Sequence, residues 1–192
     1  MAHVSAGKSA HHRLHFLGGL ALLVGLLVPG AAHAADQSTY SVGILGGIGG
    51  SFDVDPGNSY NNSSFQLNLA MTTEPRTQVG LRLGRINLDK EASFGSLHSA
   101  NLSYVTLGGE YRFKESYYDS GVYLGLGGYR LRGTDAAGRS QEQTSVGLAV
   151  GVTGEIPINP WLGVLLELSG HYVNLDEAKI YGMGHAGLTV HF

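Results

Sequence analysis

The chain has 192 residues and no cysteine, which excludes disulfide bonds and metal sites built from thiolates. Only 14% of its residues are charged and thirty are glycines without a G-X-Y repeat, so it is neither collagen-like nor rich in solubilising surface charge. A formal net charge of −3 argues against a nucleic-acid partner, which would require a basic face.

Residues 1–34 are predicted to be a secretory signal peptide. Lys8 and Arg13 lie in a His-rich n-region, an apolar run follows, and an A-x-A cleavage site ends at Ala34. The apolar run is shorter than the ~20 residues of a membrane-spanning helix, which argues against the alternative of an N-terminal anchor. Cleavage would leave residues 35–192 as one domain, with ten basic and fifteen acidic residues.

The rest of the chain consists of eight segments in which apolar and polar residues alternate. A period of two is that of a strand with one apolar face. A pair of glycines, Gly127 and Gly128, predicts a bulge in the fifth strand. All connections except the last alternate between long and short, as in outer-membrane barrels. The predicted strands span residues 40–52, 64–72, 78–84, 102–113, 121–132, 144–156, 161–175 and 181–192.

The non-apolar faces of these strands distinguish a soluble barrel from a membrane barrel. In the segment 144–156, Val146, Leu148 and Val150 share one face, and small or polar residues share the other. Small residues suit the narrow lumen of an eight-stranded barrel, whereas a soluble barrel would show many charges to water. The sequence therefore predicts an all-β fold, an eight-stranded antiparallel up-and-down transmembrane β-barrel whose apolar face meets lipid.

The few charged residues on the other face are predicted to form a polar network that plugs the lumen. In a trial register that pairs Thr77 with Phe113, Arg82 lies diagonal to Glu110 as a buried ion pair. Such pairing is expected because charges inside a barrel must be compensated. The predicted network comprises Arg82, Glu110, Arg112, Glu155, Glu167, Ser169, His171 and His185.

Part of this network could in principle carry chemistry. Glu167, Ser169 and His171 share one strand face, and a second trial register places His185 opposite His171. Two histidines with a carboxylate could bind a metal, and Ser, His and Glu could form a hydrolytic set. Buried polar groups need partners in any case, so we expect a hydrogen-bonded plug with no catalytic, cofactor or metal role.

The final strand carries a resemblance to a known family. The leader, the eight amphipathic strands and the terminal Phe192, with Val190 and Leu188 at alternate positions before it, resemble the small outer-membrane barrels of Gram-negative bacteria, of the OmpA transmembrane-domain, OmpX and opacity-protein kind. The resemblance implies a bacterial outer-membrane location. It also implies delivery by periplasmic chaperones and the barrel-assembly machinery, which would read these three residues as a signal.

The same resemblance implies the function and the partners. We expect a monomer that contacts outer-membrane lipid and lipopolysaccharide and has a structural or surface-interaction role, in adhesion or envelope integrity. Loops with acidic residues, such as Asp53 and Asp55 or Asp176 and Glu177, offer surfaces to a host or envelope ligand.

Two other functions remain open from the sequence. Some small outer-membrane barrels are lipid A deacylases with a His-x-Ser-Asn run, and the nearest segment here, residues 171–174, has Val173 in place of the serine nucleophile. A small-solute or ion pore would require the charged residues across the lumen to rearrange. We therefore expect no enzymatic activity, with a lipid A-modifying hydrolase and a pore as the alternatives.

Overall fold

Residues 40–52, 62–88 and 97–192, the part of the chain that the computed structural model describes, fold into eight antiparallel strands. Within these ranges, no helix is long and apolar enough to cross a membrane. The strands are β1 (Tyr40–Ser51), β2 (Asn62–Glu74), β3 (Thr77–Leu88), β4 (Leu97–Lys114), β5 (Asp119–Asp135), β6 (Ser140–Asn159), β7 (Leu162–Val173) and β8 (Ile180–His191).

All eight strands belong to one unit, which spans Gln37–Phe192. The signal peptide predicted for residues 1–34 and the loop residues Asp53 and Asp55 lie outside the described residues. The eight predicted strand positions are confirmed, and several strands are longer than predicted.

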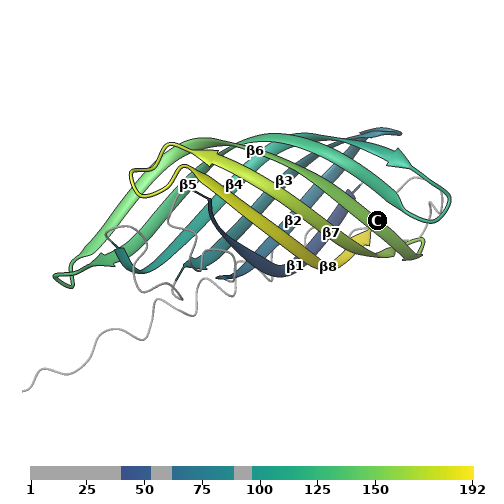
Figure 1. Ribbon diagram of the computed structural model, residues 1–192. Helices are drawn as coiled ribbons and strands as arrows, with labels where there is room; N and C mark the ends of the chain where they lie inside the picture. The colour runs from purple at the N-terminus through teal and green to yellow at the C-terminus, as the bar shows by residue number, and fades with distance from the viewer. Residues whose placement is uncertain (1–39, 53–61, 89–96) are drawn as a thin grey trace, which may run out of the picture. The chain divides into compact units, whose positions relative to one another are not determined.

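The strands pair in sequence order and close into a barrel through pairing of β1 with β8 (Figure 1). The N–H of Tyr40 donates to the carbonyl of Phe192 at 3.0 Å, and the N–H of Phe192 donates back at 3.0 Å. We call the end with Tyr40 and Phe192 the turn end, because the β2–β3, β4–β5 and β6–β7 turns lie there, and the opposite end the loop end. The predicted fold class, a closed up-and-down antiparallel barrel, is confirmed.

Side chains alternate between the lumen and the outer surface. On β6, Val146, Leu148 and Val150 are 81%, 46% and 58% exposed, whereas Ala149 between them is fully buried. A soluble barrel would show the opposite arrangement, with its apolar side chains inside. The prediction that the apolar face points outward is therefore confirmed for this part of the barrel.

Both trial registers are wrong, although neither error moves a residue to the other face. Thr77 pairs with Tyr111, two residues away from the predicted partner. His171 pairs with Tyr181, four residues away from the predicted partner. Because the side-chain period of a strand is two, an even shift leaves every side chain on its predicted face.

The predicted bulge at Gly127 and Gly128 is wrong as well. Both glycines continue the pairing of β5 with β4 and with β6 without a shift. An irregularity lies instead between Pro157 and Asn159 in the β6–β7 pairing. Proline lacks the N–H that a continuous ladder requires, which explains its position at a strand end.

The connection between β5 and β6 is shorter than the one left between the predicted strands 121–132 and 144–156. The strands continue to Asp135 and resume at Ser140, leaving a tight turn. One carboxylate oxygen of Asp135 accepts the N–H of Ala137 at 2.9 Å and the N–H of Arg139 at 2.8 Å. Gly138 adopts a φ of 77°, in the region that glycine enters without strain.

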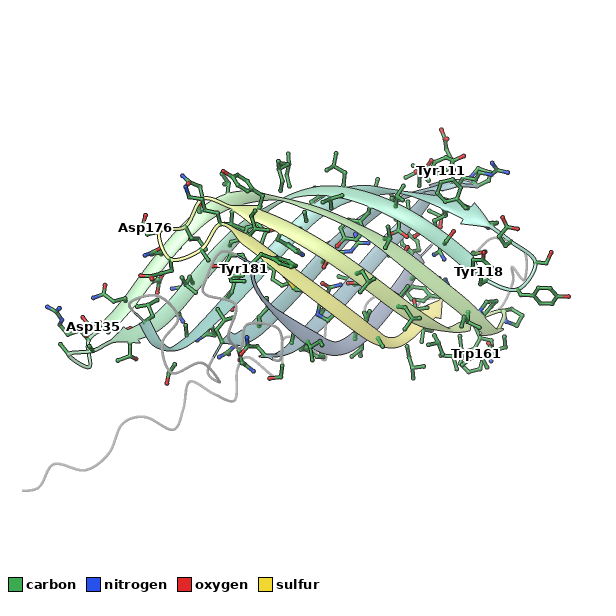
Figure 2. The ribbon with its side chains drawn as sticks, in the orientation of Figure 1. Tyr111, Tyr118, Asp135, Trp161, Asp176 and Tyr181 are labelled. Atoms are coloured by element: carbon green, nitrogen blue, oxygen red, sulfur yellow. The ribbon has the colours of Figure 1, made fainter. Side chains whose placement is uncertain are left out.

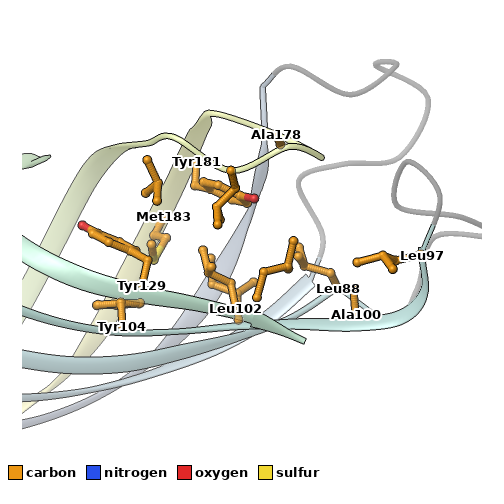
Figure 3. Close-up of a cluster of buried hydrophobic side chains, with 13 residues drawn as sticks. Leu88, Leu97, Ala100, Leu102, Tyr104, Tyr129, Ala178, Tyr181 and Met183 are labelled. Atoms are coloured by element: carbon orange, nitrogen blue, oxygen red, sulfur yellow. The ribbon is translucent and has the colours of Figure 1, made fainter. Parts of the chain in front are cut away.

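At the loop end, the lumen is filled by apolar rather than polar side chains. This apolar cluster forms a continuous packed core inside the barrel (Figure 3). The expectation of a polar lumen therefore does not hold for this end. The apolar cluster comprises Ile86, Leu88, Leu97, Ala100, Leu102, Tyr104, Tyr129, Leu131, Val173, Leu175, Ala178, Tyr181 and Met183.

The inner and outer faces thus exchange polarity along the strands. Toward the turn end of β4, Thr106 faces the lumen and Leu107 faces outward, but toward the loop end Leu102 faces the lumen and Ser103 outward. On β5, Leu131 is fully buried between two exposed arginines. On β4 and β5, the loop end therefore has the arrangement of a soluble barrel, with apolar side chains inside, whereas nearer the turn end the apolar side chains face outward.

Candidate functional site

The middle of the lumen is organised around the guanidinium of Arg82. Its Nη2 lies 2.7 Å from Oε2 of Glu110 on β4, and its Nε lies 3.1 Å from Oε2 of Glu167 on β7. Its Cζ stands 3.6 Å from the ring centroid of Tyr123 on β5. The cation is therefore paired, hydrogen-bonded and stacked, as a buried charge must be.

Glu167 is surrounded by donors from other strands. Oε1 accepts the Tyr123 hydroxyl at 3.0 Å and Nε2 of Gln66 at 2.9 Å, while Nδ2 of Asn68 lies 3.3 Å from Oε2. The hydroxyl of Tyr104 donates to Oε1 of Gln66 at 2.5 Å. Gln66 and Asn68 were not predicted as members of the network, although both lie on the polar face of their strand, opposite its apolar face.

A second group of charges lies nearer the turn end. Nη2 of Arg112 is 2.7 Å from Oε2 of Glu155 and 3.5 Å from Oδ2 of Asp119. His191 forms a hydrogen bond to the other oxygen of Glu155. The Thr153 hydroxyl donates to Oε1 of Glu110 at 2.7 Å, and Thr153 lies two residues before Glu155, so β6 contributes a side chain to each group.

A small cavity of about 30 Å³ lies beside these charges and has room for about two water molecules. Arg82, Glu110, Arg112 and Glu155 are among the residues that line it. Nε of Arg112 has no hydrogen-bond partner among the described residues. Water in this cavity would hydrate the charged groups, but the space is too small for a metabolite.

The two histidines are separate rather than paired. His171 has Nδ1 2.7 Å from the Tyr129 hydroxyl and Nε2 3.2 Å from the Ser169 hydroxyl. His185 has Nε2 2.9 Å from the Ser64 hydroxyl of β2, and no residue that the structure describes forms a hydrogen bond with its Nδ1. The register places Glu167, not the other histidine, opposite His185.

This geometry does not form the hydrolytic set considered from the sequence. Both ring nitrogens of His171 are occupied by Tyr129 and Ser169, so the carboxylate of Glu167 does not orient the imidazole. Ser169 and His171 are also buried inside a filled lumen. Among the described residues, no group of three or more His, Asp or Glu side chains could hold a metal ion.

The residues proposed as an assembly signal lie at the turn end of β8. Leu188 and Val190 point outward and are exposed. The ring of Phe192 stacks on that of Tyr40, where β8 meets β1, with centroids 6.2 Å apart. The final strand therefore presents an apolar outer face beside the first strand.

Comparison with protein families and with curated proteins finds no match. Among solved structures, Neisserial surface protein A aligns with a TM-score of 0.64 at 16% identity, over 81% of this chain and 98% of that chain. The N-terminal β-barrel domain of Pseudomonas aeruginosa OprF aligns at 0.58 and 14%, over 81% and 100%. Ail of Yersinia pestis aligns at 0.51 and 20%, over 80% and 97%. The chain therefore has the fold of eight-stranded outer-membrane barrels.

Proposed function

We propose that this chain is a monomeric outer-membrane barrel with a structural or surface-interaction role, and that its lumen is closed. The observation that carries the proposal is the exchange of polarity along β4 and β5. On these two strands, apolar side chains face outward from the turn end to about the level of Val105, and beyond that level they face inward. A protein wholly in water has no reason to reverse its faces partway along a strand, whereas a barrel that leaves a bilayer does.

Aromatic side chains support a second membrane boundary at the turn end of the barrel. Tyr111, Tyr118 and Trp161 lie together at the turn end, away from Asp135 and Asp176 at the loop end (Figure 2). All three aromatics are exposed. Tyrosine and tryptophan favour the interface between hydrocarbon and water, so the turn end would lie at the inner surface of the outer membrane.

The contents of the lumen favour a plug over a pore or an enzyme. Arg82 and Glu167 bridge the lumen between opposite strands, and the apolar cluster fills the loop end. The eight network residues, from Arg82 to His185, are all buried. A solute would have to separate buried ion pairs and open a packed core, which would cost several kcal/mol.

Surface interaction would use the loop end. One neighbour in fold, Ail of Yersinia pestis, has a structure in complex with the heparin analogue sucrose octasulfate. In this chain the β5–β6 hairpin carries charged residues at its tip, and Asp176 and Glu177 follow β7. We infer that these connections meet a host or envelope ligand after residues 1–34 have directed export and the final strand has engaged the assembly machinery.

The topology is tested with single cysteines, since the chain has none of its own. Ala137→Cys lies in the β5–β6 turn and Ser116→Cys in the β4–β5 turn, at opposite ends of the barrel. In intact Gram-negative cells, a membrane-impermeant maleimide should label Ala137→Cys alone, and Ser116→Cys only after the outer membrane is permeabilised. Labelling of both in intact cells, or recovery of the protein in the soluble periplasm, would refute the proposal.

The alternatives are tested with the folded barrel in bilayers that contain lipid A. A closed, non-enzymatic barrel should give neither discrete conductance steps nor acyl release. Conductance steps would support a pore, and acyl release would support a lipid A-modifying hydrolase.

A further inference from the structure

The level at which the faces exchange polarity can be followed across neighbouring strands. Pairing of β2 through β6 aligns one residue from each strand into rows on the outer surface. The apolar row consists of Leu67, Leu83, Val105, Gly128 and Val146. The next row toward the loop end consists of Phe65, Arg85, Ser103, Arg130 and Thr144. The row above that contains Asn87, Asn101, Arg132 and Glu142.

Three arginines lie in these two outer rows, which are polar apart from Phe65. Arg130 and Arg132 occupy alternate positions of β5, and Arg85 lies two strands from Arg130 in the same row. Adjacent strands are ~4.8 Å apart, so the backbones at Arg85 and Arg130 are separated by roughly 10 Å. We call Arg85, Arg130 and Arg132 the arginine site.

The arginine site keeps a positive charge. Nη2 of Arg130 lies 2.6 Å from Oε1 of Glu142, and Nε of Arg132 lies 2.9 Å from Oε2. Two guanidinium groups thus share one carboxylate. Within the described residues, Arg85 has no carboxylate within ion-pair distance. Among the described residues, the arginine site therefore carries three positive charges against the single negative charge of Glu142.

Its surroundings restrict the ligand. The side chains of Arg130 and Arg132 are 46% and 51% exposed, so their free N–H groups are accessible. Directly below them the apolar row begins, with Val105 and the strongly exposed Val146. A guanidinium binds phosphate through paired N–H groups. A ligand that satisfies both rows has a phosphate at one end and hydrocarbon chains at the other.

We propose that the arginine site binds the phosphate groups of a lipid in the outer leaflet around the barrel. The proposal rests on the proposed function, because only a barrel in a membrane places its apolar row against acyl chains. The backbone of the site is fixed by the packed core behind it, where Ile86 and Leu131 are fully buried. The arginines are thus presented from regular strands at the level where the lipid head groups begin.

The test uses the full barrel folded in dodecyl maltoside, a detergent without phosphate, and bis-phosphorylated lipid A as the probe. Bound lipid is counted by native mass spectrometry over a titration, with lipid A stripped of its phosphates as the matched probe. The wild-type barrel should bind the phosphorylated form at least tenfold more tightly. Combined Arg85→Gln, Arg130→Gln and Arg132→Gln should remove that preference. Arg139→Gln, which changes an arginine paired with Asp135 at the hairpin tip, should retain it.

Each other outcome overturns the inference. Equal binding of both lipids, or an unchanged preference in the triple variant, would show that the arginine site does not recognise lipid phosphate. Displacement of the lipid by millimolar inorganic phosphate would assign the site to the free anion. Arg85→Gln alone should lower affinity severalfold, and within the described part of the barrel it breaks no ion pair. Heat-modifiable migration on gels verifies the fold, and cysteine labelling in cells tests the membrane location separately.

Discussion

Nε of Arg82 on β3 lies 3.1 Å from Oε2 of Glu167 on β7, the strand on the opposite side of the closed barrel. Strands that never pair with each other are thus joined across the lumen by a buried charge pair. Replacing Glu167 would leave Arg82 with one remaining carboxylate, Glu110, and would remove the acceptor that Tyr123 and Gln66 share.

We predict that Glu167→Ala lowers the free energy of unfolding by about 3–5 kcal/mol, because it leaves buried donors and a cation incompletely compensated. Urea unfolding of the barrel in lipid vesicles measures the change. Glu142→Ala is the matched control, since that carboxylate also pairs with two arginines but is exposed, and it should change little. Similar losses in the two variants would contradict the assigned role of Glu167.

Two adjacent glycines of β1 allow a second test, which concerns the packing of β1 against β8. A Cβ on Gly47 would clash with the backbone of Gly184 and His185, whereas a Cβ on Gly46 would meet nothing within 4 Å. Gly47→Ala should therefore destabilise the barrel by about 1–3 kcal/mol or prevent folding, and Gly46→Ala should be tolerated. Heat-modifiable migration and urea unfolding compare the two. Equal stability of the two variants would mean that β1 and β8 can move apart at this point without a loss of stability.

The β5–β6 turn should depend on pH through Asp135. The backbone N–H of Arg139, helped by the side chains of Gln141 and Arg139 and the N–H of Ala137, lowers the pKa of Asp135 below its ordinary value of 3.8. A depressed carboxyl pKa stabilises the turn above the ordinary value and loses that contribution as pH falls through the lowered one. The amide signals of Ala137 and Arg139 should therefore shift in NMR spectra only below about pH 3.8. Asp135→Asn should abolish the titration, and a midpoint at or above the ordinary value would contradict the prediction.

A substitution of His171 distinguishes a lumen plug from an enzyme. Its removal leaves the Tyr129 and Ser169 hydroxyls without their partner, so His171→Ala should cost about 1–3 kcal/mol of unfolding free energy. Neither the wild-type barrel nor the variant should release acyl chains from lipid A. If the wild type releases them and the folded variant does not, His171 has a catalytic role that its hydrogen bonds conceal.

The period-two pattern predicted which faces point inward because the pattern is local and each strand carries it independently. Register is less local, so the trial pairing of Thr77 missed its partner Tyr111 by two residues. The sequence of one strand does not determine the register, that is, how far the neighbouring strand is shifted along it. Even shifts preserve both faces, and the hydrophobic pattern could not distinguish among them.

The lumen was predictable only in part, for a related reason. Charged residues such as Arg82 stand out on a face of small residues, whereas Gln66 and Asn68 look like ordinary polar alternation. The apolar cluster, which includes Leu102 and Leu131, was not predicted. The prediction assumed that the inner face of each strand is polar from one end to the other. Their neighbours Ser103 and Arg130 mark the exchange, and that change of phase is a signal that the sequence contains.

The pairing of Tyr40 with Phe192 has a consequence for how the molecule is made. It joins the two ends of the described barrel, so the contact with the greatest separation along the chain must form to complete the cylinder. Closure of so long a loop has a high entropic cost and is therefore slow. Until it occurs, folding intermediates would expose the unpaired backbone N–H and C=O groups of two strand edges. The same proximity would allow a circular permutant in which a short linker joins Phe192 to Tyr40 and new termini open at Ser116.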